Sequence, residues 1–383
     1  MKNNIDRIMN DAVSTGQAVG INCLVYKDGS EIFSGCYGFA DRENSVPMRR
    51  DTIFRLFSLS KPITAAAAMI LIDKGLLSPD DPVSKYIPEY SSLTYADGDQ
   101  ILPCPETLRI SHLLNMTSGI PYADNWGVSV RAAARLFDEI IADQKSENKL
   151  GIVEISRRAA SIPLLFKPGD SWYYGISADI IGGIIEIISG MKYSEFLRKN
   201  IFEPLGMDDT GFYVPEEKRS RFSALYSWQE NGLERDYNNH LGLTDYSKPP
   251  AFESGGAGLV STINDYSKFA RMLANKGEFN GVRLFGEETF SFMTSPQLNE
   301  KQLGGMWERL RGYNYGNFMR ILVDEEFSQL KTVKGECGWD GWTGTFFASD
   351  PANNIAILCF TQISGAGTTR QAELLCEEVY KNL

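Results

Sequence analysis

Strand-like segments lie near both ends of this 383-residue chain, and helix-like segments fill the long stretch between them. Residues 18–26 and 31–39 alternate apolar and polar side chains around a Lys-Asp-Gly turn, which predicts a β-hairpin. Residues 344–349 and 355–361 flank a second turn-like cluster near the C-terminus. The two hairpins can share one sheet if the middle of the chain is inserted between them. We therefore expect an α/β fold, with an antiparallel sheet from both chain ends flanked by helices and an inserted, mostly helical lobe.

The same pattern divides the chain into two predicted domains. Residues 1–57 and 300–383 should form an α/β domain around the antiparallel sheet, and residues 58–299 should form a mainly helical domain. The active site is expected at the junction between them. Helices are expected near residues 110–116, 129–143, 152–160, 177–189, 193–202, 262–275, 286–294 and 370–382.

One apolar helix in the predicted lobe begins with a serine and a lysine three residues apart. Ser58 and Lys61 should lie on the same face of this helix. Pro62 fixes the register because proline is tolerated only in a first turn, so the helix should start near Ser58 and end at Gly75. A base near neutral pH needs a pKa near 7 rather than lysine's usual value of about 10.4. The helix dipole and burial both favour such a decrease for Lys61.

The Ser-x-x-Lys pattern is weak by itself, because this chain contains four copies of it. The copies at Ser146 and Ser328 lie in polar stretches, and the copy at Ser189 is followed directly by glycine. Only Ser58 opens a long apolar helix. The structural alternative is a helix-capping serine next to a surface lysine.

Histidine is scarce in this chain, which restricts the bases available to a serine nucleophile. His112 falls in an amphipathic segment, and His240, the other histidine, falls in a polar one. The sequence has no Gly-x-Ser-x-Gly elbow, no His-Glu-x-x-His zinc helix, no phosphate loop and no dinucleotide-binding glycine pattern. If the protein is a hydrolase, we expect its base to be a residue other than histidine.

Three glycine-rich segments could complete a site. Residues 168–177 place adjacent tyrosines before a helix, and the Tyr174 phenol could relay a proton from the serine. Residues 338–345 predict a strand whose glycines permit close approach of a ligand and whose N–H groups could form an oxyanion hole. A packed aromatic turn and a bulged strand are the alternatives. Residues 252–262 lack the ending of a phosphate loop, so we expect a tight turn that lines a cleft.

The composition argues against several classes of partner. A net charge of −11 disfavours nucleic acid and anionic membranes, and mildly disfavours strongly anionic substrates. The N-terminus lacks the apolar core of a signal peptide, and no stretch approaches the length of a membrane span. The six cysteines form no Cys-x-x-Cys pair, and three fall in strand-like runs, which favours free thiols. We therefore expect a cytoplasmic protein with no membrane partner.

Taken in order, these elements resemble the serine β-lactamase and penicillin-binding-protein-like superfamily over residues 10–380. The greater likeness is to its class C β-lactamase-related branch, which includes carboxylesterases of family VIII type. Ser58-Leu59-Ser60-Lys61 resembles the nucleophile motif of that family.

Further segments carry the resemblance along the chain. Residues 113–119 resemble a Leu-Leu…Thr-Ser-Gly helix end, with methionine where histidine is usual. Residues 174–176 fall on a Tyr-x-Asn element, and residues 339–341 occupy the Lys/His-x-Gly strand. Residues 254–262 and 280–284 match other signatures of the family.

Two departures from the family pattern bear on the substrate. Ile176 replaces the asparagine that orients the substrate amide in lactamases, and Trp339 replaces the lysine or histidine that helps to bind the substrate carboxylate. A charge-assisted hydrogen bond contributes roughly 1.5–3 kcal/mol, so its loss should weaken binding of penicillin-like or peptidoglycan-like anions. Tryptophan at this position resembles the esterase members.

The resemblance implies a β-lactamase/DD-peptidase-like fold and a serine hydrolase that cleaves carboxylic esters through an acyl-enzyme on Ser58. Lys61 and Tyr174 would shuttle the proton, and which of the two is the base is left open. The backbone N–H groups of Ser58 and Trp342 would form the oxyanion hole, and no metal or organic cofactor would be needed. The implied substrate-binding residues are Tyr173, Trp339, Asp340, Gly341 and Trp342.

Three other functions remain open at this point. The first is a β-lactamase or a D-amino-acid peptidase or amidase, which uses the same chemistry on another leaving group. The second is an acyltransferase, and the third is a non-catalytic penicillin-binding-like protein. All of them would take a small ester or amide, and the sequence gives no expectation about oligomeric state.

Overall fold

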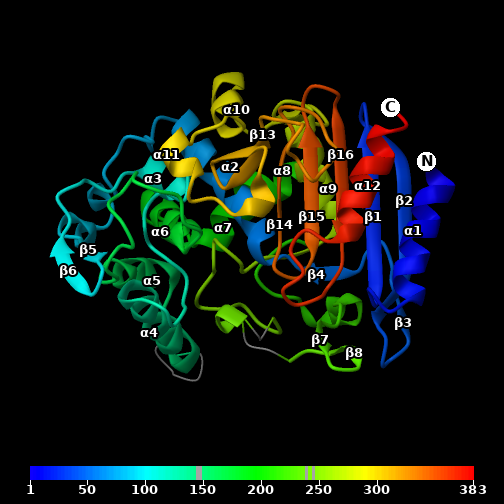
Figure 1. The fold of residues 1–383 in the computed structure, drawn as a ribbon, viewed down its shortest axis with the longest axis horizontal. Coiled ribbons are helices and arrows are strands. Elements are labelled where there is room, and N and C mark those ends of the chain that lie inside the picture. Colours follow the sequence, from blue (N-terminus) through cyan, green and yellow to red (C-terminus); the bar gives the residue numbers. More distant parts are fainter. Residues whose placement is uncertain (144–148, 238–239, 244–245) are drawn as a thin grey trace.

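The two ends of the chain meet in one eight-stranded antiparallel sheet (Figure 1). The computed structural model describes residues 1–143, 149–237, 240–243 and 246–383. The strand order of the sheet is β12-β13-β14-β15-β16-β1-β2-β3, so β16 next to β1 joins the C-terminal strands to the N-terminal ones. The strands are β12 (Tyr313–Gly316), β13 (Met319–Leu322), β14 (Cys337–Asp340), β15 (Thr345–Asp350), β16 (Ile355–Phe360), β1 (Gly20–Lys27), β2 (Ser30–Asp41) and β3 (Val46–Pro47).

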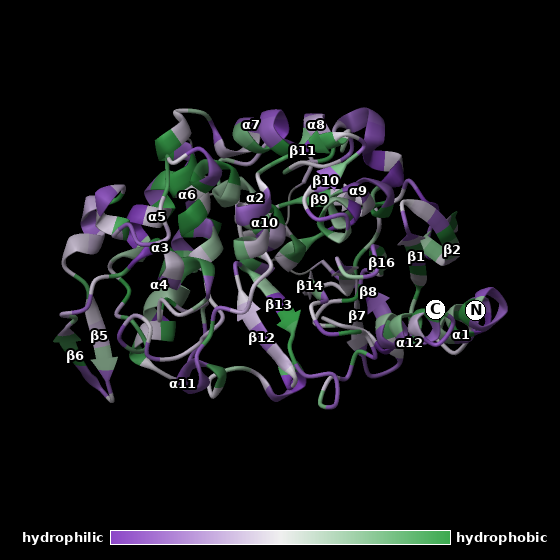
Figure 2. Ribbon diagram, turned by 90° about the horizontal axis from the view of Figure 1, so that it is seen from above, coloured by the Kyte–Doolittle hydropathy of each residue, from purple (hydrophilic) through white to green (hydrophobic). Residues whose placement is uncertain are grey.

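Helices cover both faces of this sheet, which is why β16 is buried at every position. Helix α9 (Ile263–Ala274) packs on β1, β15 and β16. Helices α1 (Lys2–Ser14) and α12 (Arg370–Tyr380) contact each other and lie on the other face, which Figure 2 shows from above. An apolar strand between two helical layers is a stable arrangement because both of its faces leave water.

A buried helix, α2 (Ser60–Asp73), lies beside the sheet and packs against helices from the middle of the chain. It contacts α6 (Ser177–Ser189), and α6 in turn packs closely on α5 (Ile152–Ala159). A Cβ on Gly183 would lie 2.3 Å from the Ser156 hydroxyl, so glycine is needed for this approach. The other α-helices are α3 (Ile110–Leu114), α4 (Val128–Asp143), α7 (Tyr193–Leu197), α8 (Glu203–Leu205), α10 (Glu287–Met293) and α11 (Glu300–Leu303).

Four small two-stranded sheets complete the described structure. One of them joins β4 to β9 and brings the segment before α2 next to the segment before α9. Their strands are β4 (Ile53–Arg55), β9 (Val260–Thr262), β5 (Thr94–Asp97), β6 (Gln100–Pro103), β7 (Tyr226–Gln229), β8 (Gly232–Arg235), β10 (Glu278–Phe279) and β11 (Val282–Arg283).

The fold class predicted from the sequence is confirmed, with two local corrections. Helix α2 begins at Ser60, and Ser58 lies in a 3-10 turn, η1 (Phe57–Leu59), directly before it. The strand expected over residues 338–345 is wrong, because β14 ends at Asp340 and the chain turns before β15. Gly344 has a φ of 82°, a left-handed conformation that suits such a turn.

Several expectations are not tested by this structure. The division into domains at residues 57 and 300 remains a prediction, and Ser146 lies outside the described residues.

Among the described residues, no helix is long and apolar enough to cross a bilayer. The same residues contain no cluster of three or more side chains arranged to hold a metal ion.

Candidate active site

The turn that carries Ser58 is held in place by hydrogen bonds from two neighbouring layers. The Thr345 hydroxyl donates to the Leu56 carbonyl at 3.1 Å, and the Tyr266 phenol donates to the Leu59 carbonyl at 2.8 Å. Phe57 has a φ of 45°, which is unusual for a side chain of this size. These contacts fix the backbone on both sides of Ser58, whose own side chain stays partly exposed.

Lys61 is fully buried and points its amine at three acceptors. Its Nζ lies 3.2 Å from Ser58 Oγ, 3.0 Å from Tyr122 Oη and 2.9 Å from the Gly256 carbonyl oxygen. A lysine ammonium can donate to all three, whereas a neutral amine has two N–H donors and one lone pair. The carbonyl can only accept, so in the neutral form the lone pair can face Ser58 or Tyr122.

Burial lowers the pKa of Lys61 to about 7, while the negative charges of Asp179 and Asp340 act in the opposite direction. The structure therefore places an amine that is partly deprotonated at neutral pH next to a serine hydroxyl. Such an amine can both take and return a proton.

Tyr174 lies next to both the serine and the lysine. Its phenol hydrogen-bonds with Ser58 and accepts from Trp339 Nε1 at 3.0 Å, and its ring centroid lies 4.6 Å from the Lys61 amine. Burial raises the pKa of Tyr174, and the bonds with Ser58 and Trp339 only partly oppose this. The three residues predicted to carry the chemistry are therefore brought together, and at neutral pH the tyrosine is the protonated member.

Tyr122 is a fourth member of this cluster that sequence reasoning missed. Burial raises its pKa well above the usual value, so its phenol stays protonated beside Lys61. A bridge between Pro121 and Gly175 positions it, and a Cβ on Gly175 would lie only 1.9 Å from the Ile120 carbonyl oxygen. The one available signal was its position just after the Thr-Ser-Gly helix end at residues 117–119.

A pocket of about 310 Å³ opens over Ser58 and is walled mainly by aromatic side chains. His240 stacks on Trp342 with ring centroids 4.0 Å apart, and burial lowers the pKa of this histidine to about 4, so it is neutral at physiological pH. Arg309 lies over the Trp307 ring and pairs loosely with Asp340 at 3.8 Å. The residues lining the pocket are Phe57, Ser58, Tyr122, Ala123, Tyr174, His240, Leu241, Trp307, Arg309, Trp339, Asp340, Trp342, Gly365 and Gly367.

Of the five predicted substrate-binding residues, Trp339, Asp340 and Trp342 line this pocket, and the other two do not. Gly341 packs against the chain before η1, where a Cβ would lie 2.2 Å from the Leu56 carbonyl oxygen. Tyr173 faces away, with its ring 6.3 Å from that of Trp126, because neighbouring residues in an extended segment point to opposite sides.

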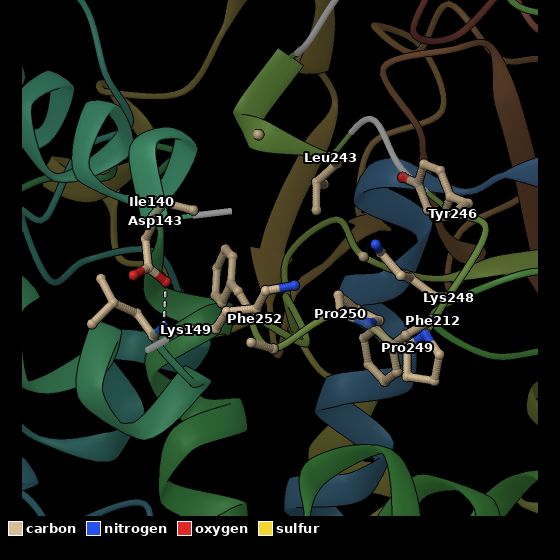
Figure 3. Close-up of a pocket in the computed structure, with 14 residues that line it drawn as sticks. Ile140, Asp143, Lys149, Phe212, Leu243, Tyr246, Lys248, Pro249, Pro250 and Phe252 are labelled. Atoms are coloured by element: carbon tan, nitrogen blue, oxygen red, sulfur yellow. Dashed lines mark hydrogen bonds between the residues drawn. The ribbon is translucent and has the colours of Figure 1, made fainter. Parts of the chain in front are cut away.

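A second pocket, of about 90 Å³, shares no lining residue with the Ser58 pocket. Figure 3 shows the residues that line it. Phe212, Leu243 and Phe252 give it apolar walls, and at one side the Leu150 N–H donates to the Asp143 carboxylate. None of the residues predicted to carry the chemistry, Ser58, Lys61 and Tyr174, lines it.

The family model described as Beta-lactamase matches residues 5–375. The chain is 32% identical over 340 residues to an uncharacterised protein of Mycobacterium tuberculosis, covering 85% of this chain and 81% of that protein. It is 29% identical to esterase EstB of Burkholderia gladioli, covering 95% of this chain and 91% of the esterase.

A solved structure gives a similar result. EstCE1, described as a hydrolase with promiscuous acyltransferase activity, superposes with a TM-score of 0.83 at 25% identity, covering 99% of this chain and 98% of that one. The similarity thus extends over the sheet, the helices and the pocket rather than over one motif.

Proposed function

Because the chain belongs to the beta-lactamase family and is a serine hydrolase, we propose that it cleaves carboxylic esters through an acyl-enzyme on Ser58. The observation that carries this proposal is the convergence of Ser58, Lys61 and Tyr174 at the base of one aromatic pocket. A serine next to a buried amine can act as a nucleophile without histidine.

In the acylation step, neutral Lys61 takes the proton of Ser58 as Oγ attacks the ester carbonyl carbon. The tetrahedral intermediate then collapses, the bond to the alcohol oxygen breaks, and that oxygen receives a proton from Tyr174 or from the Lys61 ammonium. In the second half, water gives a proton to the same pair as its oxygen attacks the acyl carbon. The bond from that carbon to Ser58 Oγ then breaks, the pair returns the proton to Oγ, and the acid leaves. We favour Lys61 as the base, because its pKa is lowered to about 7 while that of Tyr174 is raised.

The backbone N–H groups of Ser58 and Trp342 are proposed to stabilise the oxyanion. Among the described residues neither N–H donates a hydrogen bond to another backbone carbonyl, which leaves both free for a substrate oxygen. Removal of one such donor typically costs roughly 3–4 kcal/mol in the barrier.

The pocket walls favour an uncharged ester over an anionic lactam. Trp339 stands where family members carry a cation, and its N–H is already used by Tyr174. Arg309 is shared with Asp340, whose carboxylate also accepts from Thr368 at 2.6 Å. The relative EstB is named as an esterase, which agrees with a pocket that prefers uncharged esters.

The proposal is tested by one panel of substrates. The protein should hydrolyse p-nitrophenyl acetate and butyrate faster than the octanoate, and all of these faster than nitrocefin. Turnover of nitrocefin at the rate of the short esters would favour a β-lactamase instead.

Acyl transfer is a second candidate, because EstCE1 is described as a hydrolase with promiscuous acyltransferase activity. The aromatic walls could hold an alcohol where water would otherwise attack the acyl-enzyme. Product analysis with an added alcohol separates the two functions: a new ester that forms faster than the free acid identifies a transferase.

The pH dependence of ester hydrolysis should follow the protonation state of Lys61. The neutral amine is needed as the base, so kcat/KM should be low in acid, rise with pH through about 7 and then level off. The measurement is kcat/KM for p-nitrophenyl butyrate against pH, corrected for spontaneous hydrolysis. A plateau that extends down to pH values well below 7 would show that Lys61 is not the base.

The two tyrosines should differ in their effects. Tyr174→Phe removes the phenol that bonds with Ser58 and is expected to lower kcat/KM about a hundredfold. Tyr122→Phe removes one hydrogen bond of Lys61 and is expected to cost only about tenfold. Tyr173→Phe is the matched control and should match wild type, since its ring does not line the pocket. A larger loss in Tyr122→Phe than in Tyr174→Phe would reverse the roles given to the two phenols.

A further inference from the structure

A buried carboxylate lies behind Lys61, outside the pocket. Asp179 occupies the first turn of α6 and is 3% exposed. Its Oδ1 accepts from the Ser254 hydroxyl at 2.6 Å and from the Gly256 N–H at 3.1 Å. The carbonyl of the same glycine accepts from Lys61 at 2.9 Å. One residue therefore connects the carboxylate to the amine.

The space around this glycine is fully occupied. A Cβ on Gly256 would lie 2.9 Å from Asp179 Oδ2 and 2.8 Å from Tyr122 Oη. The carboxylate, the phenol and the amine thus contact a single residue, and we expect a displacement of Asp179 to shift the Gly256 carbonyl that binds Lys61. The Ser254 hydroxyl fixes the loop further by accepting from the Ala257 N–H at 3.0 Å.

We infer, on the basis of the function proposed above, that Asp179 is a positioning residue for Lys61. It holds the loop at residues 254–258 so that the Gly256 carbonyl meets the amine, and its negative charge stabilises the protonated amine in a buried place. Without this charge the ammonium would be more costly to form, and the base would stay neutral at lower pH.

The other groups near Lys61 are either uncharged at neutral pH or already paired with a cation, so we assign the stabilising charge to Asp179. The hydroxyls of Ser58 and the two neighbouring tyrosines are uncharged at neutral pH, and so is His240. Asp340 also favours the ammonium, but it has Arg309 as a partner. Burial raises the pKa of Asp179, and the hydrogen bond from Ser254 and the charge of Lys61 oppose this increase. Lys61 is therefore a cation that acts directly on this carboxylate.

Asp179→Asn separates charge from geometry. The asparagine oxygen can still accept from Ser254 and Gly256, so the loop should keep its place while the charge is lost. In the pH profile of kcat/KM for p-nitrophenyl butyrate, we expect the rise on the acidic side, called the acidic limb, to move to lower pH by about one unit. At pH 6 the variant should therefore keep a larger share of its maximal kcat/KM than wild type does.

Ser254→Ala tests the positioning part of the inference. This variant keeps the charge of Asp179 and removes a hydrogen bond that orients it. The maximal kcat/KM at high pH should therefore fall about fivefold, and the acidic limb should not shift to lower pH. Asp265→Asn is the matched control, because Asp265 is an equally buried carboxylate that binds the Asp209 N–H in another part of the molecule. Its acidic limb should coincide with that of wild type.

The outcomes distinguish this inference from the proposed function. An acidic limb of Asp179→Asn at the wild-type pH, with only a lower plateau, would overturn the electrostatic role. An unchanged plateau in Ser254→Ala would overturn the positioning role, and remains measurable if Asp179→Asn does not fold. Wild type without esterase activity would instead contradict the proposed function itself.

Discussion

Replacement of Ser58 by alanine is expected to reduce ester hydrolysis to the background rate, a loss of at least about a thousandfold in kcat/KM. The reason is that the acyl-enzyme needs a nucleophilic oxygen, and Ser58 is the only serine, threonine or cysteine among the described residues that line the pocket. The measurement is hydrolysis of p-nitrophenyl butyrate together with labelling by a fluorophosphonate, which should mark wild type and not the variant.

The chain supplies its own control for this experiment. Ser189 belongs to another Ser-x-x-Lys copy, at the end of α6, and Ser189→Ala should keep wild-type activity and labelling. Ester turnover that persists undiminished in Ser58→Ala would end the acyl-enzyme proposal.

The second large effect is expected for Lys61→Met. Methionine fills much of the lysine volume but cannot take a proton, so kcat/KM should fall by at least about a hundredfold over the whole pH range. The variant also leaves the Gly256 carbonyl and the Tyr122 phenol without their partner, and we expect a loss of about 1–3 kcal/mol in the free energy of unfolding. Thermal denaturation measured beside the kinetics separates the two losses.

Lys192→Met is the matched control, because Lys192 completes the Ser189 copy of the pattern and is exposed. It should leave both kinetics and stability close to wild type. If Lys61→Met kept more than about a tenth of wild-type kcat/KM, the base would have to be sought elsewhere, and Tyr174 would be the next candidate.

Much of the fold could be predicted because apolar side chains recur with simple periods along its helices and strands. Helix α6 forms over residues 177–189, as its apolar spacing indicated, and the two terminal hairpins do join in one sheet. The strand expected over residues 338–345 failed for a physical reason. Glycines suit a bulged strand and a tight turn equally, and here local hydrogen bonds close a turn: the Gly341 N–H donates to the Thr345 carbonyl at 2.7 Å and the Gly344 N–H to the Gly341 carbonyl at 2.9 Å.

The grouping of Ser58, Lys61 and Tyr174 could be predicted because Ser58 and Lys61 are three residues apart at the start of an apolar helix, and Tyr174 falls on an element of the family that the chain resembles. The rest of the pocket could not, since His240 and Trp307 carry no local motif and lie far from Ser58 in the sequence. Tyr122 was marked only by its position just after the Thr-Ser-Gly helix end. Tyr173 shows the complementary error: it adjoins Tyr174 in sequence, but the extended backbone turns it away from the pocket.

The most direct test of the account is the mass of the trapped intermediate. Wild-type protein quenched in acid during turnover of p-nitrophenyl butyrate should carry one added butyryl group, and peptide mapping should place it on Ser58. Lys61→Met should form this adduct far more slowly, and Ser58→Ala should not form it at all. A butyryl group found on another residue, or steady turnover with no adduct in any quench, would contradict a hydroxyl activated by the buried amine.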